Sequence, residues 1–267
     1  MINTFSIFIL KMMGLIFLII YMSCNAQNKP ADLQGSEDES SGQISHITYG
    51  TDPDAEKWYE YNENGDLSRQ SAFIDTIIFT YEGNRIIKRY LDKNSNWQSR
   101  IVYNTDTSGK IISSNIYDVD DNEISRYKFE YNAEGYLIKT IQNVLTSGAT
   151  YINEFVYESG NLKEVLAYNN QGQYSSKYAF EYYSDLPHIF NMNVNQIMDD
   201  NFPNEKLGKM NKNMIRQMAN VSKEGDTLSL VKYRYDPVTN GKLKEYQSDV
   251  LNEFDTEMIY HFKNTKL

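Results

Sequence analysis

The chain has 267 residues, which is long enough for one large all-β domain or two smaller ones. Its 36 acidic and 26 basic residues give a net charge of −10. This balance argues against nucleic acid and anionic lipid headgroups as ligands, because both are bound by clustered Lys and Arg. The 22 tyrosines, against only five prolines, indicate pleated sheets, in which aromatic side chains fit best.

Residues 1–23 have the composition of a secretory signal. Lys11 is the only charged residue in this segment, and the apolar run 12–20 follows it. As a helix this run would span ~14 Å, against a hydrocarbon core of ~30 Å. The segment therefore favours a signal peptide over a membrane-spanning helix.

The single cysteine, Cys24, comes directly after the small residue Ser23. This junction resembles the lipobox of bacterial lipoproteins, although Tyr21 stands where leucine is usual. The resemblance implies cleavage before Cys24, a diacylglyceryl thioether on its sulfur and acylation of the new amine, and two or three acyl chains give stable anchoring. The alternative is an ordinary signal peptide that leaves a free thiol.

Residues 24–43 are predicted to be the lipidated cysteine and a flexible tether, because they carry too little apolar surface to offset chain entropy. The acidic stretch 36–39 is similar to the surface-export tags of some Gram-negative lipoproteins, which lie closer to the cysteine. A solvated linker is the simpler interpretation.

A repeat dominates residues 44–267. Its pattern is an aromatic or branched residue, any residue, Tyr, a short turn with Gly, any residue, and Leu or Ile. The second tyrosines recur at intervals of roughly 25 residues, and the full set is Tyr61, Tyr81, Tyr103, Tyr131, Tyr157, Tyr182 and Tyr235. Two strands and two short turns fill such a period, so each unit is a β-hairpin.

The aromatic residues of each unit are predicted to share one face of the sheet, because strand side chains alternate. The residue between them is mostly polar, as in Glu60, Glu130 and Arg234, so the other face is expected to contact water. We therefore predict an all-β fold: an antiparallel β-hairpin meander that forms a curved or barrel-like sheet. One irregular or helical insertion, 184–213, interrupts it and is expected to cover one end of the sheet.

The repeat is similar to the YD repeats of Rhs-type secreted proteins. A closer resemblance is to a family of uncharacterised Gram-negative lipoproteins, described as a domain of unknown function with a porin-like fold. It covers residues 44–264 and depends on hairpins such as 129–137 and on Tyr183-Ser184-Asp185-Leu186-Pro187, Leu207-Gly208-Lys209 and Asn213-Met214-Ile215. The resemblance implies a curved or barrel-like antiparallel sheet, and it implies no activity and no functional residues.

A membrane-spanning pore is the less favoured alternative. Charged residues of both parities occur within the presumed strands, including Lys88, Arg89, Lys128 and Lys139. On a lipid-facing surface near the midplane each would cost ~2–4 kcal/mol. A lipid anchor would also be redundant for a spanning barrel.

Catalytic and metal motifs are not evident. The acidic run 118–123 begins like a calcium loop but lacks the glycine and glutamate that such a loop requires, so a polar hairpin tip is the better interpretation. A calcium loop at residues 92–96 is rejected for the same kind of reason. His46, His188 and His261 are dispersed, which disfavours zinc. We predict no cofactor, no metal and no enzymatic activity.

The sequence is therefore interpreted as a lipoprotein anchored in the outer membrane at Cys24, on a side that the sequence does not define, with a non-catalytic binding or scaffold domain. Its ligand would be a glycan or a protein and not nucleic acid. Trp58 and Trp97 are the candidate ligand-binding residues, because aromatic faces stack on sugar rings and grip extended peptides. Packing of both within the aromatic ladder is the alternative. The rival function is an envelope hydrolase with a carboxylate-lined cleft.

Overall fold

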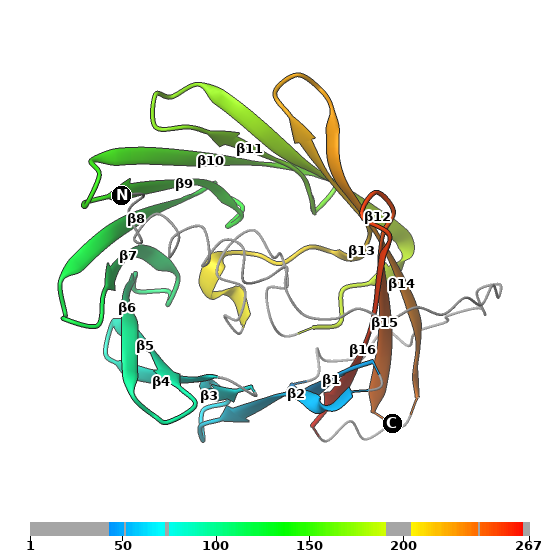
Figure 1. Ribbon diagram of the computed structural model, residues 1–267, viewed down its shortest axis with the longest axis horizontal. Coiled ribbons are helices and arrows are strands. Elements are labelled where there is room, and N and C mark those ends of the chain that lie inside the picture. The colour runs from blue at the N-terminus through cyan, green and yellow to red at the C-terminus, as the bar shows by residue number, and fades with distance from the viewer. Residues whose placement is uncertain (1–42, 51, 73–74, 191–203, 240, 264–267) are drawn as a thin grey trace, which may run out of the picture.

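The computed structural model describes residues 43–50, 52–72, 75–190, 204–239 and 241–263. In these residues, sixteen antiparallel strands form one closed barrel in which every strand pairs with its neighbours in sequence and β1 pairs with β16 (Figure 1). The predicted hairpin meander and barrel-like sheet are thus confirmed. The segments 1–23 and 24–42, including Cys24, lie outside the described residues.

The strands are mostly five to ten residues long, and two hairpin strands are longer. The first eight are β1 (Ile44–Tyr49), β2 (Asp52–Tyr61), β3 (Leu67–Ser71), β4 (Asp75–Glu82), β5 (Arg85–Asp92), β6 (Trp97–Thr105), β7 (Ile111–Tyr117) and β8 (Glu123–Tyr131). The others are β9 (Leu137–Val144), β10 (Ala149–Glu158), β11 (Asn161–Tyr168), β12 (Tyr174–Pro187), β13 (Asn213–Ser222), β14 (Thr227–Thr239), β15 (Lys242–Asp249) and β16 (Phe254–Phe262). A 3-10 helix, η1 (Asn204–Leu207), lies between β12 and β13.

The repeat builds the inner wall of the barrel. The first apolar residue of each unit is buried and belongs to a single core; these residues are Tyr59, Phe79, Ile101, Phe129, Phe155, Phe180 and Tyr260. Tyr233 is also buried. Because side chains alternate along a strand, the residues between them face the outer wall. Glu60, Glu181 and Arg234 are accordingly exposed.

The second tyrosine of the unit has a structural task of its own. The hydroxyl of Tyr81 donates to the carbonyl of Leu67 at 2.9 Å, Tyr131 donates to Ile111 at 2.6 Å, and Tyr182 donates to Leu162 at 2.8 Å. Each acceptor is the Leu or Ile that closes the preceding unit of the repeat. The two ends of the motif are therefore joined by a hydrogen bond between neighbouring hairpins.

The insertion covers the end of the barrel where the glycine turns of the repeat lie. Phe190 and Leu207 are buried in the core cluster. The backbone N of Lys209 donates to the Gly135 carbonyl at 3.0 Å, and that of Lys212 donates to Gly160 at 3.0 Å. Figure 1 shows this segment, in yellow, within the ring of strands. We call this the plugged end and the opposite one the open end.

The insertion differs in its bounds from the sequence prediction, because β12 continues to Pro187. Residues 191–203 of this insertion lie outside the described residues, so the helical structure predicted for it is tested only in part. Among the residues that the structure does describe, no helix has the length and apolar character needed to cross a membrane.

Candidate functional site

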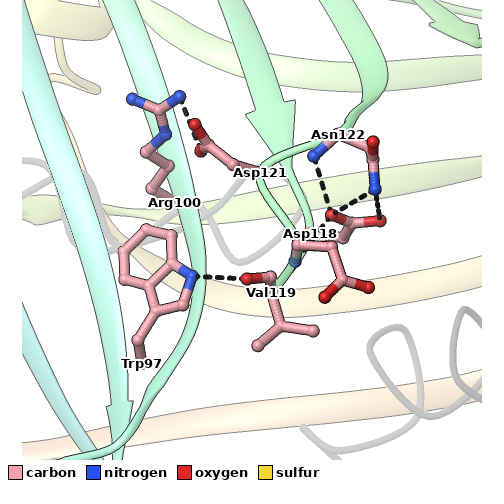
Figure 2. A network of polar contacts seen from close by, with 7 residues as sticks. Trp97, Arg100, Asp118, Val119, Asp121 and Asn122 are labelled. Atoms are coloured by element: carbon pink, nitrogen blue, oxygen red, sulfur yellow. Dashed lines mark hydrogen bonds and ion pairs between the residues drawn. The ribbon is translucent and has the colours of Figure 1, made fainter.

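Trp97, one of the two predicted ligand-binding residues, lies at the open end where β6 begins. Its indole Nε1 donates to the carbonyl oxygen of Val119 at 3.1 Å, which joins the start of β6 to the tip of the β7–β8 hairpin (Figure 2). Val119 itself is 54% exposed. The polar edge of Trp97 is therefore used within the protein, and its ring helps to hold a hairpin tip.

A cation stabilises the same tip. The guanidinium of Arg100 lies 2.7 Å from a carboxylate oxygen of Asp121 (Figure 2). It also lies 4.1 Å from the centroid of the Tyr117 ring. Asp121 has a φ of 65°, a left-handed conformation that is unusual for a residue other than glycine. The ion pair with Arg100 fixes the carboxylate that this strained turn presents.

The acidic run that begins like a calcium loop has a local function in its turn. The Asp118 carboxylate accepts hydrogen bonds from the backbone N of Asp120 at 3.0 Å and of Asn122 at 2.8 Å. Asp92 caps the β5–β6 turn in the same way, and a hydrogen bond from the Asn96 side chain, together with those from the backbones of Asn96 and Asn94, lowers its pKa. Within the described ranges, no group of three His, Cys, Asp or Glu residues could hold a metal ion.

Trp58, the other predicted residue, lies on the outer wall at the seam where the barrel closes. Its ring stacks on His46 with centroids 4.3 Å apart, and His46 stacks on His261 at 3.7 Å. These three residues come from β2, β1 and β16, and we call them the seam stack. Trp58 is 47% exposed, and its Nε1 donates to Glu56 at 2.9 Å.

A small residue and a lysine flank the seam stack on the neighbouring strands. Trp58 pairs with the small residue Ser71 on β3, and His261 pairs with Lys242 on β15. Burial, together with the neighbouring His46 and Lys242, lowers the pKa of His261 to about 4. Burial also lowers the pKa of His46. The stack is therefore neutral at pH 7 and presents aromatic surface without a histidine charge.

Trp58 and Trp97 do not form one platform, because three strands, β3 to β5, lie between β2 and β6. Sequence reasoning treated the histidines as dispersed and missed that barrel closure stacks His46 on His261. The available signal was that each histidine is next to an inward residue, His46 beside Ile47 and His261 beside Tyr260, which places both histidines on the outer face.

A buried carboxylate on the inner wall was also missed. Glu245 is 4% exposed, and burial raises its pKa to about 7. Gln247 donates to its carboxylate at 2.6 Å, and the hydroxyl of Tyr260 lies 3.4 Å from the other oxygen. The sequence signal was its shared parity with Leu243, a residue of the core.

The outer wall of β7 to β9 carries a polar hollow of about 400 Å³. Its lining includes Asn115, Arg126, Lys128 and Asn143. Arg126 is paired with a glutamate at 2.6 Å and Lys128 with another at 2.7 Å. The two cations of the hollow are thus already neutralised by neighbouring carboxylates.

Known structures resemble this barrel. A porin-like protein from Bacteroides uniformis superposes with a TM-score of 0.56 and 17% identity, over 82% of this chain and 98% of that one. A porin-like protein from Bacteroides vulgatus gives 0.58 and 12%, over 83% and 99%. No protein-family model and no curated protein matches the sequence. At these identities the likeness shows the fold alone, which is that of a porin-like β-barrel.

Proposed function

We propose that the protein is a non-catalytic binding or scaffold module of the bacterial cell envelope, held at the outer membrane by a lipid on Cys24. The observation that carries the proposal is a porin-like barrel whose outer wall is charged and whose one end is occupied by its own chain. Gln43, where the tether meets the barrel, lies at that plugged end, because its side chain donates to Gly65 at 3.1 Å. A tether of about 20 residues spans ~25 Å.

The outer wall supports an aqueous location for the barrel. Cross-strand ion pairs occur along it: Lys139 with Glu154 at 3.1 Å, Lys177 with Glu164 at 2.7 Å, and Lys244 with Glu257 at 3.3 Å. In water such pairs are nearly neutral in energy. Facing lipid near the midplane, each lysine would cost ~2–4 kcal/mol. This cost argues against a spanning pore and for a barrel that is tethered to the membrane.

The seam stack is the better of the two tryptophan sites for a ligand. The indole N–H of each tryptophan is hydrogen-bonded within the protein, but Trp58 is 47% exposed beside Ser71, whereas Trp97 is only partly exposed. A sugar ring or an apolar side chain of a protein fits against such a face.

The hydrolase alternative depends on Glu245, because burial raises the pKa of this carboxylate to about 7. A general acid must reach its substrate. Glu245 is buried and hydrogen-bonded by Gln247. Its position favours a structural role.

The anchor is tested by growing cells with an alkyne fatty acid and comparing the wild type with Cys24→Ala and, as a matched control, Asn25→Ala. We expect label and membrane fractionation in the wild type and the control, and neither in Cys24→Ala. Membrane retention of unlabelled Cys24→Ala would refute the lipid anchor. Protease treatment of intact cells then reports which side of the membrane the barrel occupies.

The ligand site is tested by fluorescence, because the chain has two tryptophans. In Trp97→Phe only Trp58 emits, and in Trp58→Phe only Trp97 emits. Titration with peptidoglycan fragments and with soluble polysaccharides should change the emission of Trp58 and leave Trp97 unaffected. A ligand that binds without changing the emission of Trp58 would exclude the seam stack as the contact.

A further inference from the structure

Two neighbouring hairpin tips at the open end expose apolar side chains. The exposed fractions are 54% for Leu228, 45% for Val250, 50% for Leu251 and 37% for Phe254. Turn residues are ordinarily polar, because they face water and bury nothing. We call these four residues the rim patch. It is formed by the β13–β14 and β15–β16 hairpins, which are neighbours in the barrel.

The rim patch is held in a fixed shape. The backbone N of Val250 donates to the Leu230 carbonyl at 2.8 Å, which fastens the β15–β16 tip to β14. Asp249, which is 5% exposed, accepts hydrogen bonds from Ser229 at 3.0 Å and from the side chain of Asn252 at 2.8 Å. A surface that is already ordered loses less conformational entropy on binding.

The charge around the patch is negative. Exposed carboxylates flank it on both tips, whereas the one lysine of these tips, Lys223, lies 3.6 Å from a carboxylate oxygen of Glu224. The carboxylates are Glu224, Asp226, Glu253 and Asp255. The chemistry that matches this surface is therefore apolar and cationic.

The patch lies at the opposite end of the barrel from Gln43, the first described residue. All turns that lead from an odd-numbered to an even-numbered strand lie at the open end, because consecutive strands are antiparallel. Gln43 and the end of β16 lie at the other end, where the backbone N of Lys263 donates to Gln43 at 2.7 Å. Figure 1 shows the β13–β14 hairpin, in orange, projecting from the ring.

We propose that the rim patch is a docking surface for a cationic segment of a partner protein, one that presents basic residues together with aliphatic side chains. The proposal rests on the binding role put forward above and is independent of the lipid anchor and of the seam stack. An anionic lipid surface fits poorly, since the flanking carboxylates repel it. A second copy packed two-fold on the same patch would oppose like charges.

The test uses the full mature chain carrying Cys24→Ala, which needs no detergent, and a fluorescent ten-residue peptide of alternating lysine and leucine. Fluorescence anisotropy should show saturable binding that weakens as salt is raised. The triple variant Leu228→Ser, Val250→Ser, Leu251→Ser should lose at least tenfold in affinity. The matched control is Ile112→Ser with Ile138→Ser, which removes apolar side chains that are 42% and 36% exposed near the plugged end.

Each outcome is decisive for the proposal. Loss of binding in the triple variant but not in the control, with unchanged urea midpoints, supports it. Equal binding by the triple variant overturns it, as does equal binding of a peptide with glutamate in place of lysine. Binding of the rim patch to anionic vesicles would replace the partner protein with a lipid surface, and a dimer that the triple variant abolishes would replace it with a second copy. A response of Trp58 to saccharides is unaffected by any of these results.

Discussion

Substitution of Gly208 by alanine tests how the insertion is attached to the barrel. Gly208 has a φ of +89°, and a Cβ there would lie 2.8 Å from the Gly135 carbonyl oxygen, 3.0 Å from the Leu137 nitrogen and 3.0 Å from a ring carbon of Tyr131. Two of these three atoms belong to the backbone of the β8–β9 turn and cannot move freely. The insertion must therefore shift away from the turn.

The expected loss has three parts. A left-handed conformation costs alanine about 1–2 kcal/mol. Losing the hydrogen bond from Lys209 to Gly135 costs about 1 kcal/mol. Partial withdrawal of Leu207, which is 4% exposed, from the core costs about 2 kcal/mol. Together Gly208→Ala should lower the free energy of unfolding by about 4–5 kcal/mol.

The measurement is urea unfolding followed by tryptophan fluorescence, and Gly225→Ala is the matched control. Gly225 has a φ of +94°, and a Cβ there would have nothing within 4 Å. The control should lose only the backbone contribution of about 1–2 kcal/mol. Equal losses in the two variants would refute the conclusion that close contact with the β8–β9 turn fixes the insertion.

Three further predictions concern hydrogen bonding and pH. Tyr131→Phe removes a donor to the Ile111 carbonyl and should cost about 1–2 kcal/mol in urea unfolding, whereas Tyr151→Phe, at a residue 42% exposed, should cost almost nothing. The raised pKa of Glu245 means that its ionisation opposes folding as pH rises from 4.5 to about 7, so Glu245→Gln should gain up to about 3 kcal/mol over wild type at pH 8 and little at pH 4. The lowered pKa of His261 means that the unfolded chain binds more protons below pH 6.5, so stability falls as pH drops towards 4. His261→Gln should reduce this acid loss by about 1–2 kcal/mol after solvent screening, and an unchanged slope of stability against pH would contradict the burial of the ring.

The inner and outer faces of the barrel could be read from the sequence. Phe129 and Tyr131 flank Glu130, and period-2 alternation alone places the aromatic pair inside and the glutamate outside. Closure of the sheet into a barrel could not be predicted from the sequence. It depends on the pairing of β1 with β16, which are far apart in the chain, and on the stagger of all strands. Alternation carries no information about curvature.

The candidate sites depended on closure in the same way. His46 and His261 are 215 positions apart in sequence and adjacent only because the barrel is closed. Trp58 could be selected as a candidate ligand-binding residue from its residue type alone, but its stacking partners could not be predicted from the sequence. The burial of Glu245 was missed for a different reason. Its position in the alternating strand predicts an inward side chain, whereas the general rule that carboxylates face water predicts an outward one.

The rim patch gathers exposed apolar side chains on two adjacent hairpin tips, where they add little to the core of the barrel. Many turns of the barrel are capped by a polar residue such as Asn132 and have a glycine such as Gly135 at positive φ. Val250 and Leu251 follow a strand with the usual inward core residues, yet they are exposed and contribute little to the core. Apolar residues that lie together on two adjacent, preorganised tips and add little to the core are explained better by binding than by folding.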